Sequence, residues 1–414
     1  MLWAICAVAV CVQSPSLAQQ GRTVEITVPN AAVRSGPSEE YDRVTVLPAG
    51  IKLPVVEREG DWYRVALGDL LQAYVSSAVV ELLPEGAAPS QARVTDISTA
   101  GFEKGTRVVM SLSAPVPYRV IQRLRPAALE LDLFGCRLAQ YGIRQREGDQ
   151  LVLAIEQVQL GTNTAELTFH LPQKQQTGYS VTYREDGALI LDIRRPYEAR
   201  DLRGKLIGLD PGHGGNDSGA RGRGGLREKD ANLDIALRLK PLLEQAGAQV
   251  CLTREGDVSL SEAGDPLSVQ LDVRRTLTRR AACDFFLSVH NNDVGDGGAR
   301  GEVSGTETYY WTPMSILPAR CVQKAVCAAL GTSYRFTSWR PFYVLRDTDC
   351  PRILVECAYV SYPPEEALLK QADFRQKAAE GIFAGLRDFF RLAATSDGLE
   401  PAEVTPAVGA APPG

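Results

Sequence analysis

The apolar pattern of this chain changes near residue 204, and that change constrains the fold more than any other feature. Before it, short segments alternate apolar and polar residues and are rich in β-branched and aromatic side chains, which is typical of half-buried strands. After it, continuous apolar segments alternate with stretches of helical periodicity. Such alternation favours a mainly parallel sheet covered by helices on both faces. The chain is therefore expected to be multidomain, with all-β units followed by an α/β unit.

The α/β unit is expected to span residues 204–392. Its strands are predicted at short apolar segments bounded by turn residues, namely KLIGLD, VCLTR, DFFLSVH, TETYYW and RILVEC. Helices are predicted between or after these strands, over 229–248, 267–282, 315–331 and 372–393. The apolar face of the first helix is expected to consist of Leu233, Leu237, Leu242 and Leu243.

The first half of the chain is expected to hold two β units. Residues 22–84 contain short alternating segments punctuated by glycine and proline, which predicts a small β-barrel. A linker rich in proline and alanine follows. Residues 93–197 then carry a weak internal repeat, in which the pattern of 107–135 recurs at 165–196. A duplicated set of strands predicts a sandwich of two similar sheets.

The two ends of the chain differ in composition from the rest. Residues 1–18 are interpreted as a secretory signal peptide, because their apolar run is too short to span a bilayer and small residues follow it. Residues 393–414 are expected to be a disordered tail. No other segment looks transmembrane, so no stable membrane insertion is expected after signal removal. The net charge of −5 gives no electrostatic reason to expect a nucleic-acid partner.

Seven cysteines remain after the expected signal peptide, and none of them has CxxC spacing. Because they lie inside apolar patterns, most are predicted to be small buried side chains. An odd number in an oxidising compartment leaves at least one unpaired. A disulfide between Cys321 and Cys327 is one pairing that the sequence leaves open.

Three polar side chains lie where predicted strands of the α/β unit end. His213 follows the first strand in the loop PGHGG, His290 ends DFFLSVH, and Glu356 lies near the end of RILVEC. The carboxyl ends of parallel strands gather at one edge of a sheet, so these groups are expected to meet there. Glu228, which opens the first predicted helix, is a fourth candidate. Two of the chain's three histidines therefore point to the same edge.

Two imidazoles and a carboxylate are suited to a catalytic zinc ion, because three protein ligands leave a position open for water. The metal lowers the pKa of that water, and Glu356 is a candidate to accept its proton and pass it to a leaving amine. Asp210 is expected to steady an imidazole N–H. Other interpretations stay open, since a glycine-rich loop can cradle phosphate and Glu228 can be a helix N-terminal acid favoured by the dipole.

The order of these motifs resembles the zinc-dependent N-acetylmuramoyl-L-alanine amidases of the type 3 family. The resemblance covers residues 205–390 and is carried by LIGLDPGHGGNDSG, LREKD, LSVH, GTETYY and RILVEC. It implies zinc ligands at His213, Glu228 and His290, and a catalytic glutamate at Glu356. It also implies hydrolysis of the amide between N-acetylmuramic acid and the L-alanine of the stem peptide, with Zn²⁺ as cofactor and peptidoglycan as substrate.

The two β units resemble modules that accompany wall enzymes. Residues 22–84 are similar to a bacterial SH3 domain, a module that often binds peptidoglycan. Residues 93–197 resemble the AMIN module, which helps to place wall amidases in the envelope. The resemblance implies that these modules could also contact partner proteins of division or of the envelope. Together with the signal peptide, it implies secretion to the cell envelope, with the periplasm as the expected compartment.

The match to the amidases is not uniform. Arg274 of LDVR falls on a further family position, whereas Ala358, Tyr359 and Tyr362 depart from the usual residues after the catalytic glutamate. The departures bear on the preferred stem peptide or glycan more than on the reaction. Two other functions stay open: a peptidoglycan-binding scaffold with an inactive amidase domain, and another zinc peptidase of the cell wall.

Overall fold

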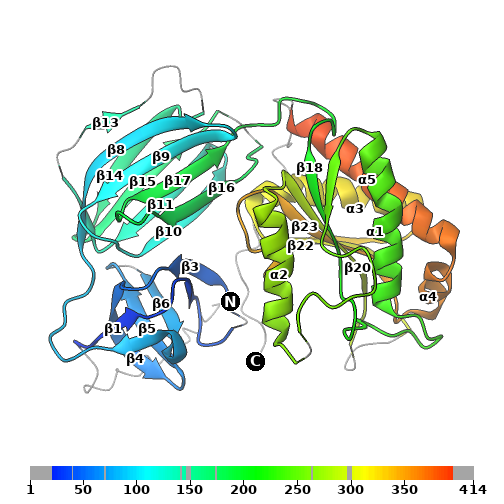
Figure 1. Ribbon diagram of the computed structural model, residues 1–414, viewed down its shortest axis with the longest axis horizontal. Coiled ribbons are helices and arrows are strands. Elements are labelled where there is room, and N and C mark those ends of the chain that lie inside the picture. The colour runs from blue at the N-terminus through cyan, green and yellow to red at the C-terminus, as the bar shows by residue number, and fades with distance from the viewer. Residues whose placement is uncertain are drawn as a thin grey trace, which may run out of the picture.

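The computed structural model describes residues 21–394 except 40, 70, 140–141, 146–150, 173–174, 263 and 296–300. The predicted signal peptide, 1–18, and nearly all of the predicted tail, 393–414, lie outside the described residues. Two β units and one α/β unit follow each other along the chain and meet at a common junction (Figure 1). Among the residues described, no helix has the length and apolar character that crossing a membrane requires.

The first unit is a seven-stranded antiparallel sheet that shares one apolar core. Its strands are β1 (Thr23–Ile26), β2 (Ala31–Arg34), β3 (Arg43–Leu47), β4 (Lys52–Glu59), β5 (Trp62–Leu67), β6 (Leu71–Ser76) and β7 (Val80–Leu82). They pair in the order β3-β2-β6-β5-β4-β1-β7. Alternate side chains, such as Leu53, Val65 and Val75, are fully buried in the shared core. The prediction of an all-β unit from the alternating pattern is confirmed.

The second unit is a sandwich of a four-stranded and a six-stranded sheet. Its strands are β8 (Ala92–Phe102), β9 (Gly105–Leu112), β10 (Tyr118–Leu124), β11 (Ala127–Phe134), β12 (Cys136–Leu138), β13 (Ile143–Arg144), β14 (Ala154–Leu160), β15 (Thr164–His170), β16 (Tyr179–Tyr183) and β17 (Leu189–Arg194). One sheet has the order β10-β11-β15-β14, and the other β12-β8-β9-β17-β16 with β13 beside β8. The predicted sandwich is therefore confirmed.

The internal repeat is shared between both sheets, and neither copy forms a sheet of its own. Strands β9, β10 and β11 belong to the first copy, and β15, β16 and β17 are their counterparts in the second. The first copy places one strand in the six-stranded sheet and a hairpin in the other, and the second copy does the reverse. As a result, β9 pairs with β17 and β11 pairs with β15, each across copies.

The α/β unit is built on a six-stranded, mainly parallel sheet. Its strands are β18 (Leu206–Pro211), β19 (Gln249–Leu252), β20 (Phe285–Asn292), β21 (Thr306–Tyr310), β22 (Tyr334–Trp339) and β23 (Arg352–Tyr359). They lie in the order β19-β18-β20-β23-β21-β22. The first four are parallel, and β21 pairs antiparallel with β23. The strand β22 was not among the predicted ones, because its polar sequence lacks an apolar run.

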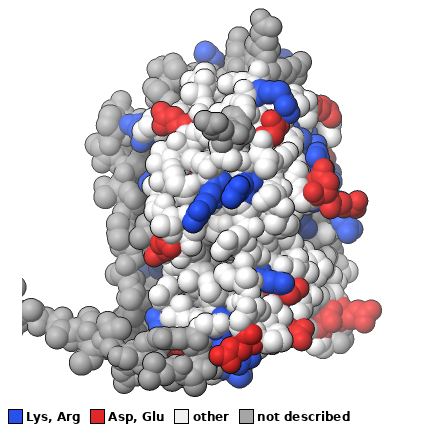
Figure 2. Space-filling view, turned by 90° about the vertical axis from the view of Figure 1, so that its left-hand side faces the viewer, with Lys and Arg blue, Asp and Glu red and all other residues white. Residues whose placement is uncertain are grey.

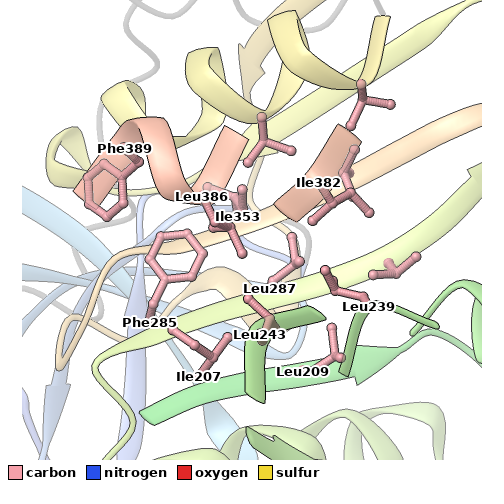
Figure 3. Packing of buried hydrophobic residues seen from close by; sticks show 14 of the residues in the cluster. Ile207, Leu209, Leu239, Leu243, Phe285, Leu287, Ile353, Ile382, Leu386 and Phe389 are labelled. Atoms are coloured by element: carbon pink, nitrogen blue, oxygen red, sulfur yellow. The ribbon is translucent and has the colours of Figure 1, made fainter. Parts of the chain in front are cut away.

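Helices cover this sheet on both faces, as predicted. They are α1 (Glu228–Gln245), α2 (Leu267–Arg280), α3 (Ile316–Leu330), α4 (Pro363–Leu369) and α5 (Ala372–Ala393). On one face, α1, α3 and α5 bury aliphatic and aromatic side chains against the sheet, as Figure 3 shows for Leu239, Phe285 and Ile382. On the other face, Leu271 of α2 packs against a second cluster around Phe286. The central strands β18, β20 and β23 are therefore held rigidly from both sides.

The buried face of α1 differs from the prediction. Of the four leucines expected on it, only Leu243 is fully buried, and Leu237 is 40% exposed. The helix instead buries Ile235 and Leu239 in the core. The reason is that Glu228 and the residue one turn later, Asn232, must also face the sheet edge, which rotates the helix away from the leucine stripe.

The disulfide between Cys321 and Cys327, which the sequence left open, is also excluded. Cys321 and Cys327 both lie in α3, six residues apart. A rise of about 1.5 Å per residue separates them by about 9 Å along the helix axis, beyond the reach of a disulfide. All seven cysteines of the described chain are free.

Candidate active site

The loop after β18 places His213 at the carboxyl edge of the sheet. His213 has a φ of 62°, a left-handed conformation that turns its side chain back toward β20. Glycine precedes it for a steric reason, since a Cβ on Gly212 would lie 2.2 Å from the His290 ring. The two imidazoles can therefore approach with their ring centroids 4.9 Å apart.

Glu228 lies between the two imidazoles. Its Oε2 is 3.0 Å from His213 Nε2, and its Oε1 is 2.9 Å from His290 Nδ1. The carboxylate comes from the first residue of α1, and it is 5% exposed. The ligand atoms of the three side chains all lie within 4.8 Å of one another. The structure thus brings together the three side chains that the sequence singled out as metal ligands.

The charges of this cluster depend on one another. Burial disfavours ionisation of Glu228, but hydrogen bonds to the two histidines outweigh it and hold the pKa of Glu228 well below its usual range. Burial also lowers the pKa of His213, yet hydrogen bonds to Asp217 and Glu228 raise that pKa to about 10. The carboxylates of Glu228 and Asp217 therefore stabilise positive charge on the neighbouring His213 imidazole. The same negative charge would stabilise a cation bound at this place.

The carboxylate that steadies an imidazole is Asp217, and the expectation for Asp210 is wrong. Asp217 Oδ2 lies 2.7 Å from His213 Nδ1, and the other oxygen accepts the backbone N–H of Gly219. Asp210 is fully buried beneath the loop and accepts hydrogen bonds from Thr253 and Arg274. The left-handed turn at His213 explains the difference, because it directs the ring toward residues that follow it.

Arg274 links α2 to the loop that carries His213. Its guanidinium donates to Asp210 at 2.6 Å, to the carbonyl of Pro211 at 2.9 Å and to the carbonyl of His213 at 2.6 Å. Burial raises the pKa of Asp210, but the charge of Arg274 outweighs it, and the net shift is downward. Arg274 therefore acts as a structural clamp on the loop and does not reach the imidazoles.

Glu356 lies beside His290 and is poorly satisfied. The two residues are paired in the register of β20 and β23, so their side chains emerge on the same face of the sheet. Glu356 is buried, and its Oε2 has no hydrogen-bond partner within the described part of the chain. Burial, followed by the charges of Glu228 and Glu307, raises the pKa of Glu356 well above its ordinary value. Such a carboxyl group is suited to take up and release a proton.

Sequence reasoning missed Glu307 of β21, which lies opposite Glu356 in the antiparallel pair. It is 2% exposed and accepts hydrogen bonds from Asn292 at 2.8 Å and from Arg335 at 2.6 Å. The Tyr359 hydroxyl donates to it as well, at 2.5 Å. The available signal was a single glutamate inside the otherwise apolar strand segment TETYYW.

Comparison with protein families gives matches to two parts of the chain. A family model described as N-acetylmuramoyl-L-alanine amidase matches residues 207–388, which contain all of the side chains described above. A second, described as bacterial SH3 domain, matches residues 29–81 in the first β unit. For the sandwich, the resemblance to the AMIN module stays a prediction.

Curated relatives match the same C-terminal part. The amidase LytC of Bacillus subtilis is 36% identical over 188 residues, which are 45% of this chain and 36% of LytC. The germination-specific N-acetylmuramoyl-L-alanine amidase of Bacillus subtilis is 30% identical over 197 residues, 46% of this chain and 81% of that relative. Among solved structures, the amidase AmiC2 of Nostoc punctiforme is 35% identical with a TM-score of 0.40, covering 44% of this chain and 94% of AmiC2.

Proposed function

Because this chain belongs to the N-acetylmuramoyl-L-alanine amidase family, we propose that it hydrolyses the amide bond between N-acetylmuramic acid and the L-alanine of the peptidoglycan stem peptide. The observation that carries the proposal is the convergence of His213, Glu228 and His290, with the unpartnered carboxyl oxygen of Glu356 beside them. We assign the three converging side chains as metal ligands and Glu356 as the proton carrier.

The ligand set fits Zn²⁺. Two imidazole nitrogens and one carboxylate oxygen, all within 4.8 Å of one another, are the donor types found in catalytic zinc sites with an open position. When bound, zinc supplies a Lewis acid that polarises the scissile carbonyl and lowers the pKa of a water molecule. Asp217 fixes the orientation of the His213 ring through Nδ1, so that Nε2 points toward Glu228 and the proposed metal position.

Glu356 moves the proton. Its buried carboxyl group has a raised pKa and a free oxygen, so it can accept the proton of the attacking water and then give it to the amine of L-alanine as that group leaves. The products are a glycan with a free lactyl carboxylate and a stem peptide with a free amino group.

The rest of the chain supports a role at the cell wall. The bacterial SH3 domain and the sandwich lie against the amidase domain, where they can hold polymeric substrate near it. Peptidoglycan is thus the proposed partner, and the envelope outside the cytoplasm the proposed location. The periplasm, and partner proteins bound through the β units, remain the expectations set by the sequence.

The test is product analysis on purified peptidoglycan by mass spectrometry, with the full chain and added Zn²⁺. We expect intact stem peptides that begin with L-alanine, together with peptide-free glycan. His213→Ala should lose both metal and products, whereas Glu356→Gln should keep the metal and lose the products. A parent protein without zinc or products would indicate a binding scaffold. Peptides that leave alanine on muramic acid would indicate a peptidase.

A further inference from the structure

A cavity of about 730 Å³ lies where the three units meet. The SH3 domain contributes β3 with Arg43, and the sandwich contributes Tyr118 and β16. The amidase domain contributes α2 and the segment 343–349, which carries Arg346. The cavity is separate from the metal-ligand cluster, since none of the three proposed zinc ligands lines it. Nothing in the proposed reaction uses these residues.

The cationic groups of this junction outnumber the anionic groups that could neutralise them. The cavity is lined by Asp272, Asp347 and Asp349 and by four arginines. Arg275 pairs with Asp272 and Asp347, and Arg352, behind the lining, pairs with Asp349. Within the described chain, no ion pair engages the other three arginines of the lining, Arg43, Arg279 and Arg346.

Two of these three arginines, Arg43 and Arg346, are partly removed from water. The Arg43 Nε is buried and has no hydrogen-bond partner among the described residues. Burial, followed by the charges of Arg34, Arg43 and Arg275, lowers the pKa of Arg346 to about 10. Like charges brought together away from water destabilise one another unless an anion joins them. On the face seen in Figure 2, basic and acidic side chains are scattered among uncharged residues.

The cavity is also rich in aromatic side chains and is held in a fixed shape. Tyr343 lies under two guanidinium groups, those of Arg275 at 4.9 Å and Arg346 at 5.5 Å from the ring centroid. Backbone hydrogen bonding joins the sandwich to the amidase domain beside it, with Tyr179 N donating to the Thr348 carbonyl at 2.7 Å. A rigid lining of aromatic rings and arginines fits the ring faces and carboxylates of an acidic saccharide or peptide.

We propose that this junction binds a carboxylate-bearing fragment of peptidoglycan, at a site separate from the active site. The inference rests on the proposed function, because amide hydrolysis creates a lactyl carboxylate on the glycan and frees an acidic stem peptide. Arg43 and Arg346 come from different units, so a bound carboxylate bridges the SH3 domain and the amidase domain. The anion offsets the repulsion among arginines that no ion pair of the described chain engages.

The experiment is isothermal titration calorimetry of the full chain with three separate probes. They are peptide-free glycan strands, an L-alanyl-D-glutamyl stem peptide, and inorganic phosphate. Each is titrated into the parent protein, into the double variant Arg43→Gln/Arg346→Gln, and into Arg387→Gln/Arg391→Gln, which removes two exposed arginines of α5 and serves as the charge-matched control. Arg43→Lys keeps the charge and separates electrostatics from packing, and thermal melting of every variant verifies folding.

We expect one or both peptidoglycan fragments to bind the parent protein. The dissociation constant should rise about tenfold for each arginine removed, and it should also rise with the salt concentration. Binding of glycan alone assigns the site to the lactyl carboxylate, and binding of peptide alone assigns it to the peptide carboxylates. The inference is overturned if neither fragment binds, if only phosphate binds, or if the double variant binds like the parent. Hydrolysis is measured on the same proteins, so binding without hydrolysis overturns the proposed function alone.

Discussion

Replacement of Asp217 by asparagine tests how the structure prepares His213 for a metal. Asp217 Oδ2 is 2.7 Å from His213 Nδ1, a short, charge-assisted contact. A hydrogen bond to a charged group contributes about 1.5–3 kcal/mol when shielded from water. The Asp217 side chain is 34% exposed, so screening favours the lower end of that range. We therefore expect Asp217→Asn to weaken zinc binding about tenfold, which corresponds to about 1.4 kcal/mol.

The assay is competition for zinc with a chelator of known affinity, with metal content measured by mass spectrometry. Asp257→Asn is the matched control. Asp257 anchors the same loop by accepting the Gly215 N–H at 2.8 Å and the Lys229 ammonium at 2.7 Å, but it does not touch an imidazole. The control should bind zinc within about twofold of the parent. Equal weakening by both variants would mean that the loop, and not ring orientation, governs the affinity, and the reasoning would then be refuted.

Three further predictions follow from the site and from the cysteines. Glu356→Gln should keep its zinc and lower turnover by about 10²- to 10⁴-fold, and wall digestion at the parent's rate would exclude the proton-carrier role. Gly212→Ala should cost about 1–3 kcal/mol in thermal unfolding and reduce zinc content, because the new methyl would overlap the His290 ring; an unchanged melting curve would contradict the steric argument. A hydrogen bond to Cys283 lowers the pKa of the Cys251 thiol to about 7, so a disulfide oxidant should convert these two thiols to a disulfide. If peptide mapping after oxidation finds that both thiols can still be alkylated, the prediction of this disulfide is wrong.

The sequence was sufficient to predict which strand ends carry the chemistry. His213, His290 and Glu356 each follow or end an apolar segment, and parallel strands bring such ends to one edge wherever the exact register lies. Glu228 was weaker as a candidate on its own, because an acidic residue at a helix start has a common local explanation. Its bridging position between two imidazoles is a property of the assembled sheet and helix.

What could not be predicted depends on backbone turns and on register. The sequence places Asp210 and Asp217 at similar distances from His213, and only the left-handed φ of that residue decides which carboxylate meets its ring. Glu307 needed knowledge that β21 returns antiparallel beside β23, since that pairing sets it opposite Glu356. Similarly, the repeat in the sandwich was visible as a pattern, but the exchange of its strands was not.

The pairing of β9 with β17 and of β11 with β15 has a consequence for how the sandwich can be divided. One copy expressed alone would leave strands of both sheets without their hydrogen-bonded neighbours, and only the other copy could supply those neighbours. By the same logic, a chain cut in the connection between the copies should reassemble from its two fragments.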